Sequence, residues 1–319
     1  MFRSPIAKDL EEFLQFKRRR GYKYVRAEYT LRCFDRFVSK CVREQGRSFR
    51  LDQTPLAWLA TRSIRKPIST APELATLRRF WEHMRSRHPR RYPRDITWPQ
   101  LSVKRVFVPH ILNQNEIRGL LRMIDAVEPV YVRSLRRTAF LVLYCTGLRF
   151  GELARLRMQD VDLQRQVIFV SESKGRARWV PFHPSLGKEL SAYMRKRRLE
   201  DDRPSRPDDH FFIRSKDRGL SVSWISGMLR DLLRQAGLKP VHGRAGPRPY
   251  DLRHAFAVHR LTRWYRQGID LHARLAWLSA YMGHVNMVGT ETYLTATPEL
   301  LALAAHRFRQ RFQDKRRFK

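Results

Sequence analysis

The chain has 319 residues, of which 65 are lysine or arginine and 30 are aspartate or glutamate, giving a formal net charge of +35 at pH 7. A charge of this size needs a polyanion as partner, and DNA or RNA is the obvious one. Hydrophobic residues make up 42% of the chain, enough to bury the cores of about two domains, which excludes a basic tail without a fold.

The N-terminus carries acidic residues where a signal peptide needs an apolar core. No apolar run approaches the roughly 20 residues that a membrane span requires. The sequence also contains no Cys-x-x-Cys or His-Glu-x-x-His pattern, which are common metal-binding arrangements. We therefore expect a cytoplasmic protein that binds no membrane and no metal.

Residues 1–88 predict a small domain made of helices only. Apolar residues recur at helical spacing in three stripes: Ile6, Leu10, Phe13 and Leu14; Leu31, Phe34, Val38 and Cys41; Leu74, Leu77, Trp81 and Met84. Basic residues gather at the turns between the helices: Lys17, Arg18, Arg19, Arg20, Arg62, Arg65 and Lys66. Each of them is a candidate for binding a DNA phosphate, and each can equally belong to a solvated charged face.

Residues 89–107 have the composition of a linker. Three prolines and several arginines, including Arg90 and Arg91, interrupt the helical spacing between His88 and Pro99. Prolines stiffen such a segment, and its arginines can follow the backbone of a DNA duplex. We place the domain boundary here.

The second predicted domain covers residues 108–297 and is mainly helical. Asn113 or Asn115 can cap its first helix, and the apolar run 139–145 predicts a core helix that stops at Gly147. A β-hairpin follows, with strands over 167–170 and 178–181. The fold class is therefore mainly α, with a small antiparallel β-hairpin or sheet.

Four residues in this second domain form a set suited to cleaving a phosphodiester. Arg149 follows Thr-Gly-Leu, Arg253 follows Asp-Leu, His284 follows Met-Gly, and Tyr293 comes nine residues later. Two guanidinium groups on one phosphate can hold the extra negative charge of a five-coordinate phosphorus. A tyrosine can then supply the nucleophile.

The order, context and spacing of these motifs resemble the tyrosine site-specific recombinases, also called phage integrases. Residues 253–301 are similar to recombinases of small mobile elements that carry several recombinases together. The resemblance implies a two-domain clamp on double-stranded DNA that cuts and rejoins strands through a 3′-phosphotyrosyl link at Tyr293, without cofactor or ATP. Such an enzyme integrates, excises or transposes a mobile element and exchanges strands through a four-way junction.

The resemblance also implies a role for each site residue. Arg149 and Arg253 would clamp the phosphate, and Lys174 in the hairpin turn would protonate the leaving 5′ oxygen. His284 would donate to a non-bridging oxygen or act as a base toward Tyr293. We expect the two guanidinium groups and the histidine to make the tyrosine nucleophilic at neutral pH, although a free phenol has a pKa near 10.

Tyr250 departs from the pattern, because three residues before the second arginine the family usually carries histidine and often lysine. A tyrosine can donate one hydrogen bond to a phosphate oxygen, but it brings no positive charge. His242 or His254 can take its place geometrically, but we expect His254 to face away from the site, because it is the direct helical neighbour of Arg253. Glu152 and Asp251 are expected to be structural partners of the two arginines.

Residues 298–319 predict a terminal helix with Leu300, Ala304, Phe308 and Phe312 on one face. The resemblance implies that this helix docks on the neighbouring protomer of a tetramer, and packing within the same chain is the alternative. Whether partner recombinases join the assembly stays open. Two other functions stay open: a DNA-relaxing enzyme of the type IB topoisomerase kind, and a non-catalytic DNA-binding accessory protein that kept the fold.

Overall fold

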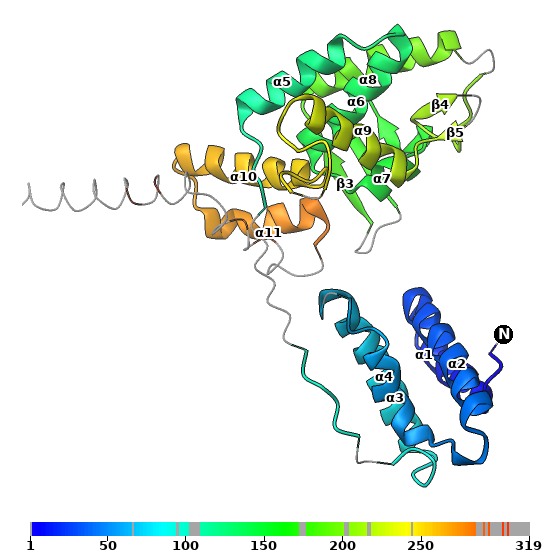
Figure 1. Cartoon of the computed structure of the whole chain (residues 1–319). Coiled ribbons are helices and arrows are strands. Elements are labelled where there is room, and N and C mark those ends of the chain that lie inside the picture. Colours follow the sequence, from blue (N-terminus) through cyan, green and yellow to red (C-terminus); the bar gives the residue numbers. More distant parts are fainter. Residues whose placement is uncertain are drawn as a thin grey trace, which may run out of the picture. The chain divides into compact units, whose positions relative to one another are not determined.

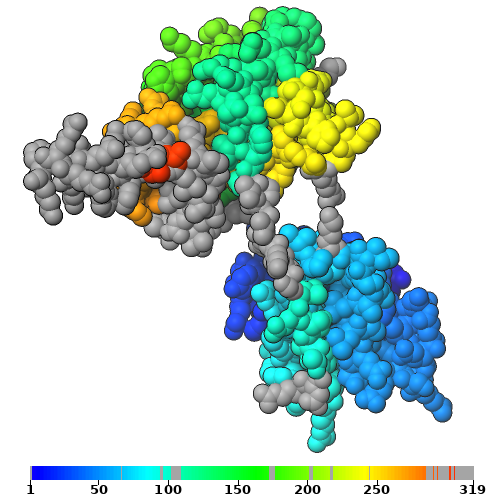
Figure 2. Space-filling model, turned by 60° about the vertical axis from the view of Figure 1, so that its left-hand side comes forward, coloured from blue at the N-terminus to red at the C-terminus, as the bar shows by residue number. Residues whose placement is uncertain are grey.

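The computed structural model describes the following parts of the chain: residues 2–65, 67–93, 96–101, 109–171, 177–200, 204–215, 218–243 and 245–284, with Thr290, Tyr293, Ala302 and Ala305. The chain divides into two compact units, Met1–Val106 and Phe107–Lys319. Figure 1 shows the helices and strands of each unit, and Figure 2 shows the chain as a space-filling model in the same colours.

The first unit is helical throughout its described part. Its helices are α1 (Ala7–Arg19), α2 (Val25–Gln45), α3 (Thr54–Ala60) and α4 (Pro67–Arg85), with short 3-10 turns at Gly46–Ser48 and Leu51–Gln53. The predicted stripes meet in one core, where Phe13, Phe34 and Phe80 are fully buried. Their aromatic rings pack edge to face, as in the pair formed by Phe13 and Phe80.

This core extends into the segment that we expected to be a linker. Tyr92 is fully buried, and its hydroxyl donates a hydrogen bond to the Asp9 carboxylate. Its ring packs edge to face against Trp81, whose indole nitrogen donates to the Pro93 carbonyl at 3.1 Å. Trp98 packs against the same core. The first unit is therefore larger than residues 1–88, because aromatic side chains beyond the last helix close it.

The second unit combines helices with small antiparallel strands, as predicted. Its helices are α5 (Gln114–Asp125), α6 (Val130–Thr146), α7 (Phe150–Arg155), α8 (Pro184–Glu200), α9 (Val222–Gln235), α10 (Asp251–Arg266) and α11 (Leu271–Met282), with a 3-10 turn at Met158–Asp160. Its strands are β1 (Val161–Asp162), β2 (Val167–Val170), β3 (Arg178–Pro181), β4 (Ile213–Ser215) and β5 (Arg218–Gly219).

The strands form two separate small sheets. One has the order β1-β2-β3 and the other pairs β4 with β5. In the first sheet Val170 lies opposite Arg178, and Val167 lies opposite Pro181. The two strands of this hairpin have the predicted bounds.

Helix α6 lies at the centre of the second unit, where it packs against α8 and α10. Its interior residues, among them Ala139, Phe140 and Val142, are fully buried. The helix ends at Gly147, which takes the left-handed conformation (φ 63°) and donates its backbone N–H to the Leu143 carbonyl at 2.9 Å. This stop places Arg149 at the start of α7, directly beside the core.

Gly147→Ala should lower the free energy of unfolding by about 2–4 kcal/mol, because an alanine is strained at this φ and overpacks the core. An added Cβ would lie 2.4 Å from the ring of Phe256. Urea unfolding measures the effect. Gly119→Ala is the matched control, since nothing lies within 4 Å of its added Cβ inside α5, and it should be neutral or stabilising. Equal stabilities for the two variants would contradict this account of the helix end.

The terminal helix predicted for residues 298–319 lies outside the described residues, apart from Ala302 and Ala305. Among the helices that the structure describes, none is both long and apolar enough to span a membrane.

Candidate active site

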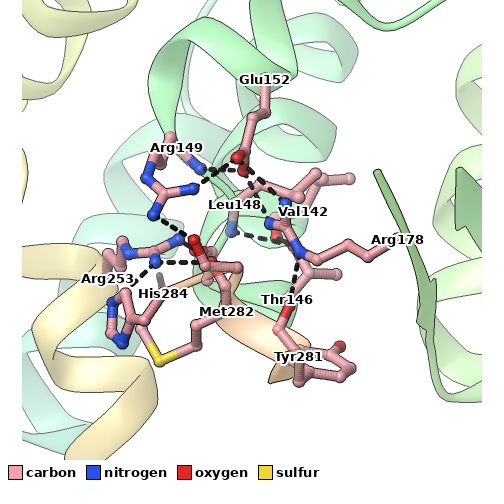
Figure 3. Close-up of polar contacts among 12 residues, drawn as sticks. Val142, Thr146, Leu148, Arg149, Glu152, Arg178, Arg253, Tyr281, Met282 and His284 are labelled. Carbon is pink, nitrogen blue, oxygen red and sulfur yellow. Dashed lines mark hydrogen bonds and ion pairs between the residues drawn. The ribbon is translucent and has the colours of Figure 1, made fainter. Parts of the chain in front are cut away.

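Three arginines from distant parts of the second unit meet at the C-terminal end of α11 (Figure 3). The last carbonyl groups of a helix have no partner within it and carry partial negative charge. The Tyr281 carbonyl accepts from Arg178 at 2.7 Å, and the carbonyl of the next residue, Met282, accepts from Arg253 at 2.7 Å. Arg149 donates to the carbonyl after that at 2.6 Å. The end of α11 thereby holds all three guanidinium groups together.

Gly283 has to be a glycine at this junction. It ends α11 in the left-handed conformation (φ 68°), and a Cβ added to it would lie 2.6 Å from the Arg178 guanidinium. The Met-Gly-His motif thus has a backbone explanation: the glycine leaves room for the arginines and turns His284 toward them.

Glu152 neutralises two of the three arginines. Its carboxylate is almost fully buried and pairs with Arg149 at 2.8 Å and with Arg178 at 2.9 Å. It also accepts the backbone N–H of Arg149 at 2.9 Å, which caps α7. Glu152 is therefore a structural partner of the first arginine, as expected from the sequence.

Arg178 was not recognised as a site residue from the sequence. A signal was present, because Arg178 and Val180 share one face of β3 and Val180 is fully buried. A charged residue on the buried face of a strand needs a partner of opposite charge. Here that partner is Glu152.

Arg253 is 2% exposed, on the first turn of α10. Besides Met282, its guanidinium donates to the Gly147 carbonyl and, at 3.1 Å, to Nε2 of His284. Asp251, which we expected beside it, pairs instead with Arg248 at 3.1 Å. Burial lowers the pKa of Arg253, but an arginine stays charged at neutral pH.

His284 uses both ring nitrogens. Because Arg253 can only donate, Nε2 of His284 is the acceptor, and the neutral ring carries its proton on Nδ1, which contacts the Thr290 hydroxyl at 2.7 Å. Burial, followed by the nearby arginines, lowers the pKa of His284 to about 4. The ring is therefore neutral at pH 7 until a negative charge such as a phosphate raises its pKa.

Tyr293 is 3% exposed and packs into a small core with Phe256 and Met282. Its ring stacks on that of His284, with the ring centres 6.3 Å apart. Burial raises the pKa of Tyr293, and Arg253 lowers it by a smaller amount. The expectation that the surrounding cations make the phenol nucleophilic is therefore not met in this arrangement, because desolvation of the phenolate outweighs them.

The expectation that His254 faces away is wrong. Its Nδ1 lies 3.1 Å from the Tyr293 hydroxyl oxygen, and the two rings are 5.4 Å apart. Tyr250 directly precedes α10, and its ring packs edge to face against Phe150 and His254. The role of Tyr250 toward a phosphate stays a prediction.

Two predicted site residues, Lys174 and Lys66, lie outside the described residues. The other basic candidates are in the first unit. Four of them form ion pairs there: Arg18 with Glu28, Arg62 and Arg65 with Glu73, and Arg91 with Asp9. The rest do not share that arrangement: Lys17 and Arg20 lie over the ring of Phe16, and Arg19 and Arg90 are exposed. Their contact with DNA stays a prediction.

The model of the phage integrase family matches residues 110–299. Among curated proteins, the putative integrase/recombinase y4rE of Sinorhizobium fredii is 31% identical over 314 residues, which cover 95% of each chain. The tyrosine recombinase XerC of Staphylococcus saprophyticus is 26% identical over 254 residues, or 77% of this chain and 76% of that protein.

A solved structure with a similar fold is the Tn1549 transposon integrase in complex with a circular intermediate DNA. It has a TM-score of 0.65 at 18% sequence identity and covers 94% of this chain and 99% of that one. At 18% sequence identity, this similarity is evidence for the fold only.

Proposed function

Since this chain belongs to the phage integrase family of tyrosine recombinases, we propose that it is a site-specific DNA recombinase that cleaves and rejoins strands through Tyr293. The observation that carries the proposal is the convergence of Arg149, Arg253, His284 and Tyr293 at the end of α11. Relatives named integrases and recombinases favour strand exchange over simple relaxation of DNA.

The proposed chemistry uses the two arginines as a phosphate clamp. Main-chain carbonyls hold each guanidinium group, so both groups are in position before DNA binds. Little reorganisation is then needed during the reaction. His284 becomes a donor to a non-bridging oxygen once the phosphate charge raises its pKa from about 4. Lys174 in the hairpin turn gives a proton to the leaving 5′ oxygen.

We further propose that the first unit binds the DNA duplex through its basic residues while the second carries the chemistry. The side chains of Arg18, Arg65 and Arg91 are 50%, 54% and 45% exposed, so their guanidinium groups can also contact a phosphate. Because its proposed substrate is DNA, we place the protein in the cytoplasm. The name of the Sinorhizobium relative agrees with a role in a mobile element, whose integration, excision or transposition the enzyme would carry out.

Wild-type protein should form an SDS-resistant adduct with a nicked suicide substrate in EDTA and without nucleotide. Arginines take the place of a metal, and the phosphotyrosyl bond keeps the energy of the phosphodiester. Substrates would carry the junctions that flank the gene, and denaturing gels measure the adduct. A strict magnesium requirement for cleavage would contradict the mechanism, and DNA binding without any adduct would favour the non-catalytic alternative.

We propose that residues 298–319 of one protomer dock on a second copy when the protein assembles on paired sites. The second unit offers an apolar groove of about 660 Å³ between β3, α10 and α11. Trp179 and Trp277 on its rim are 60% and 70% exposed, which is unusual for such large apolar side chains. The apolar stripe predicted for residues 298–319 matches the apolar chemistry of this groove.

Deleting residues 298–319 should leave single-site DNA binding within about threefold of wild type and abolish complexes on paired sites. Gel-shift titration at two salt concentrations, with cross-linking, measures both. Trp277→Ala in the intact chain should weaken the same complexes. Weaker single-site binding with a flatter salt dependence would mean that the segment contacts DNA instead. Unchanged assembly after the deletion would refute docking.

A further inference from the structure

His254 is placed to act on the hydroxyl group of Tyr293. It lies on the first turn of α10, directly after Arg253, and its side chain is 18% exposed. Its Nδ1 is 3.1 Å from the tyrosine oxygen, within hydrogen-bond distance. This contact joins the proposed nucleophile to a group that can change its protonation state near neutral pH.

The neighbouring carboxylate favours the tautomer in which Nδ1 accepts the proton of the tyrosine. Oδ1 of Asp251 lies 4.0 Å from Nε2 of His254, and this carboxylate is 1% exposed. A negative charge on that side of the ring favours a proton on Nε2 and would stabilise the imidazolium once it forms. Tyr293 is then the donor of the hydrogen bond and His254 its acceptor.

Other bases around the hydroxyl are less suited. Both nitrogens of His284 already have partners in Arg253 and Thr290. Tyr250 stands where the family usually carries histidine, and a neutral phenol is a poor proton acceptor. His254 is four residues beyond it on α10, with its ring packed against that of Tyr250 at 5.8 Å.

The surroundings of His254 keep it neutral and ready to accept. Burial lowers its pKa first, and Arg248 and Arg253 add to this while Asp251 opposes it. The charged and titratable groups that face it are Tyr250, Asp251, Arg248, Arg253, His284 and Tyr293. A neutral ring is the active form of a base, so activity should be lost as the pH falls through its pKa.

We propose that His254 is the proton acceptor for Tyr293 in strand cleavage, an assignment that rests on the proposed function of Tyr293. As the tyrosine oxygen forms its bond to phosphorus, its proton passes to Nδ1 of His254. The bond from phosphorus to the 5′ oxygen breaks, and that oxygen takes a proton from the separate acid, Lys174. When the 5′ hydroxyl attacks the phosphotyrosine, its proton returns to Lys174, and His254 returns the other proton to the oxygen of Tyr293.

The test is single-turnover cleavage by His254→Gln, which keeps a polar side chain but loses the base. The substrate is a suicide duplex with sulfur in place of the bridging 5′ oxygen, because a thiolate leaves without needing a proton. Cleavage by the variant should be slower by about 10²–10⁴-fold on both the sulfur and the oxygen substrate. Its rate should climb about tenfold per pH unit between roughly pH 6 and 9, whereas the wild type levels off.

His259→Ala is the matched control, since His259 lies on the same helix but bonds to the Tyr144 hydroxyl at 2.9 Å. It should cleave within about threefold of wild type. If His254→Gln cleaves as fast as wild type or faster, His254 merely tethers the tyrosine and the proposal is overturned. If that variant does not fold, the pH profile of the wild type decides. A wild-type rate that keeps rising about tenfold per pH unit between roughly pH 7 and 9 would also overturn the proposal, because a neutral His254 is already the base there.

Failure of this inference is distinguishable from failure of the proposed function. If Tyr293→Phe still formed the adduct, Tyr293 would not be the nucleophile, and the proposed function would fail. If adduct formation needed Tyr293 but not His254, only the assignment of His254 as the base would fail.

Discussion

Tyr293→Phe should bind target DNA within about threefold of wild type and form no covalent adduct, because only the nucleophilic oxygen is lost. The ring stays, so its packing against Phe256 and its stacking on His284 should persist. Filter binding and denaturing gels with the nicked substrate measure the two properties. The lost hydrogen bond to His254 should change the free energy of unfolding by only about 1 kcal/mol.

Tyr281→Phe is a matched control for this experiment. Tyr281 is a second tyrosine close to the arginines, and its hydroxyl donates to the Pro181 carbonyl at 2.9 Å. This variant should keep adduct formation. If Tyr293→Phe still forms the adduct, or if only Tyr281→Phe fails to form it, then Tyr293 is not the nucleophile.

Arg253→Lys should slow cleavage by about 10²–10³-fold or more, because a lysine cannot offer the forked donors that hold a phosphate from two sides. The substitution should also cost about 2–4 kcal/mol of stability. The guanidinium bonds to the buried carbonyls of Gly147 and Met282 and to His284, and a lysine cannot satisfy all three in the same geometry. Single-turnover cleavage and urea unfolding separate the two losses.

Arg260→Lys is the control on the same helix. Its guanidinium lies over the rings of Phe256 and Trp264, about one to two turns beyond the site. Cleavage should stay within about threefold of wild type. Near-normal cleavage by Arg253→Lys would show that a single positive charge is sufficient and that the clamp is misassigned.

The parts of the fold that could be predicted depend on local patterns. Asn113 caps α5 with a capping box, one of the two caps expected, and the strands β2 and β3 have their predicted bounds. The stop of α6 at Gly147 follows from the need for a left-handed residue there. In each case the residues that decide the structure are close together in the sequence.

The parts that could not be predicted depend on contacts between distant residues. Arg91 pairs with Asp9, more than 80 positions away, and Tyr92 joins the first core for the same kind of reason. His254 was expected to face away because it follows Arg253 on a helix. Tyr293 reaches it from 39 positions further along the chain, which no local pattern reveals.

The burial of Tyr293 keeps its hydroxyl away from a DNA phosphate in this arrangement. Its hydroxyl is hydrogen-bonded to His254 in a residue that is 3% exposed, so a phosphodiester cannot approach it in this arrangement. We infer that DNA binding must move the surroundings of Tyr293 before attack, while the contact between its hydroxyl and His254 is kept. Covalent chemistry would then be confined to protein that has engaged its target.

The most direct test of the account is to locate the covalent bond. Trapped complexes would be digested with protease and nuclease, and the nucleotide-bearing peptide sequenced by mass spectrometry. We predict one modified residue, Tyr293, linked through its phenolic oxygen to a 3′ phosphate. A nucleotide on any other residue, or a link to a 5′ phosphate, would contradict the account.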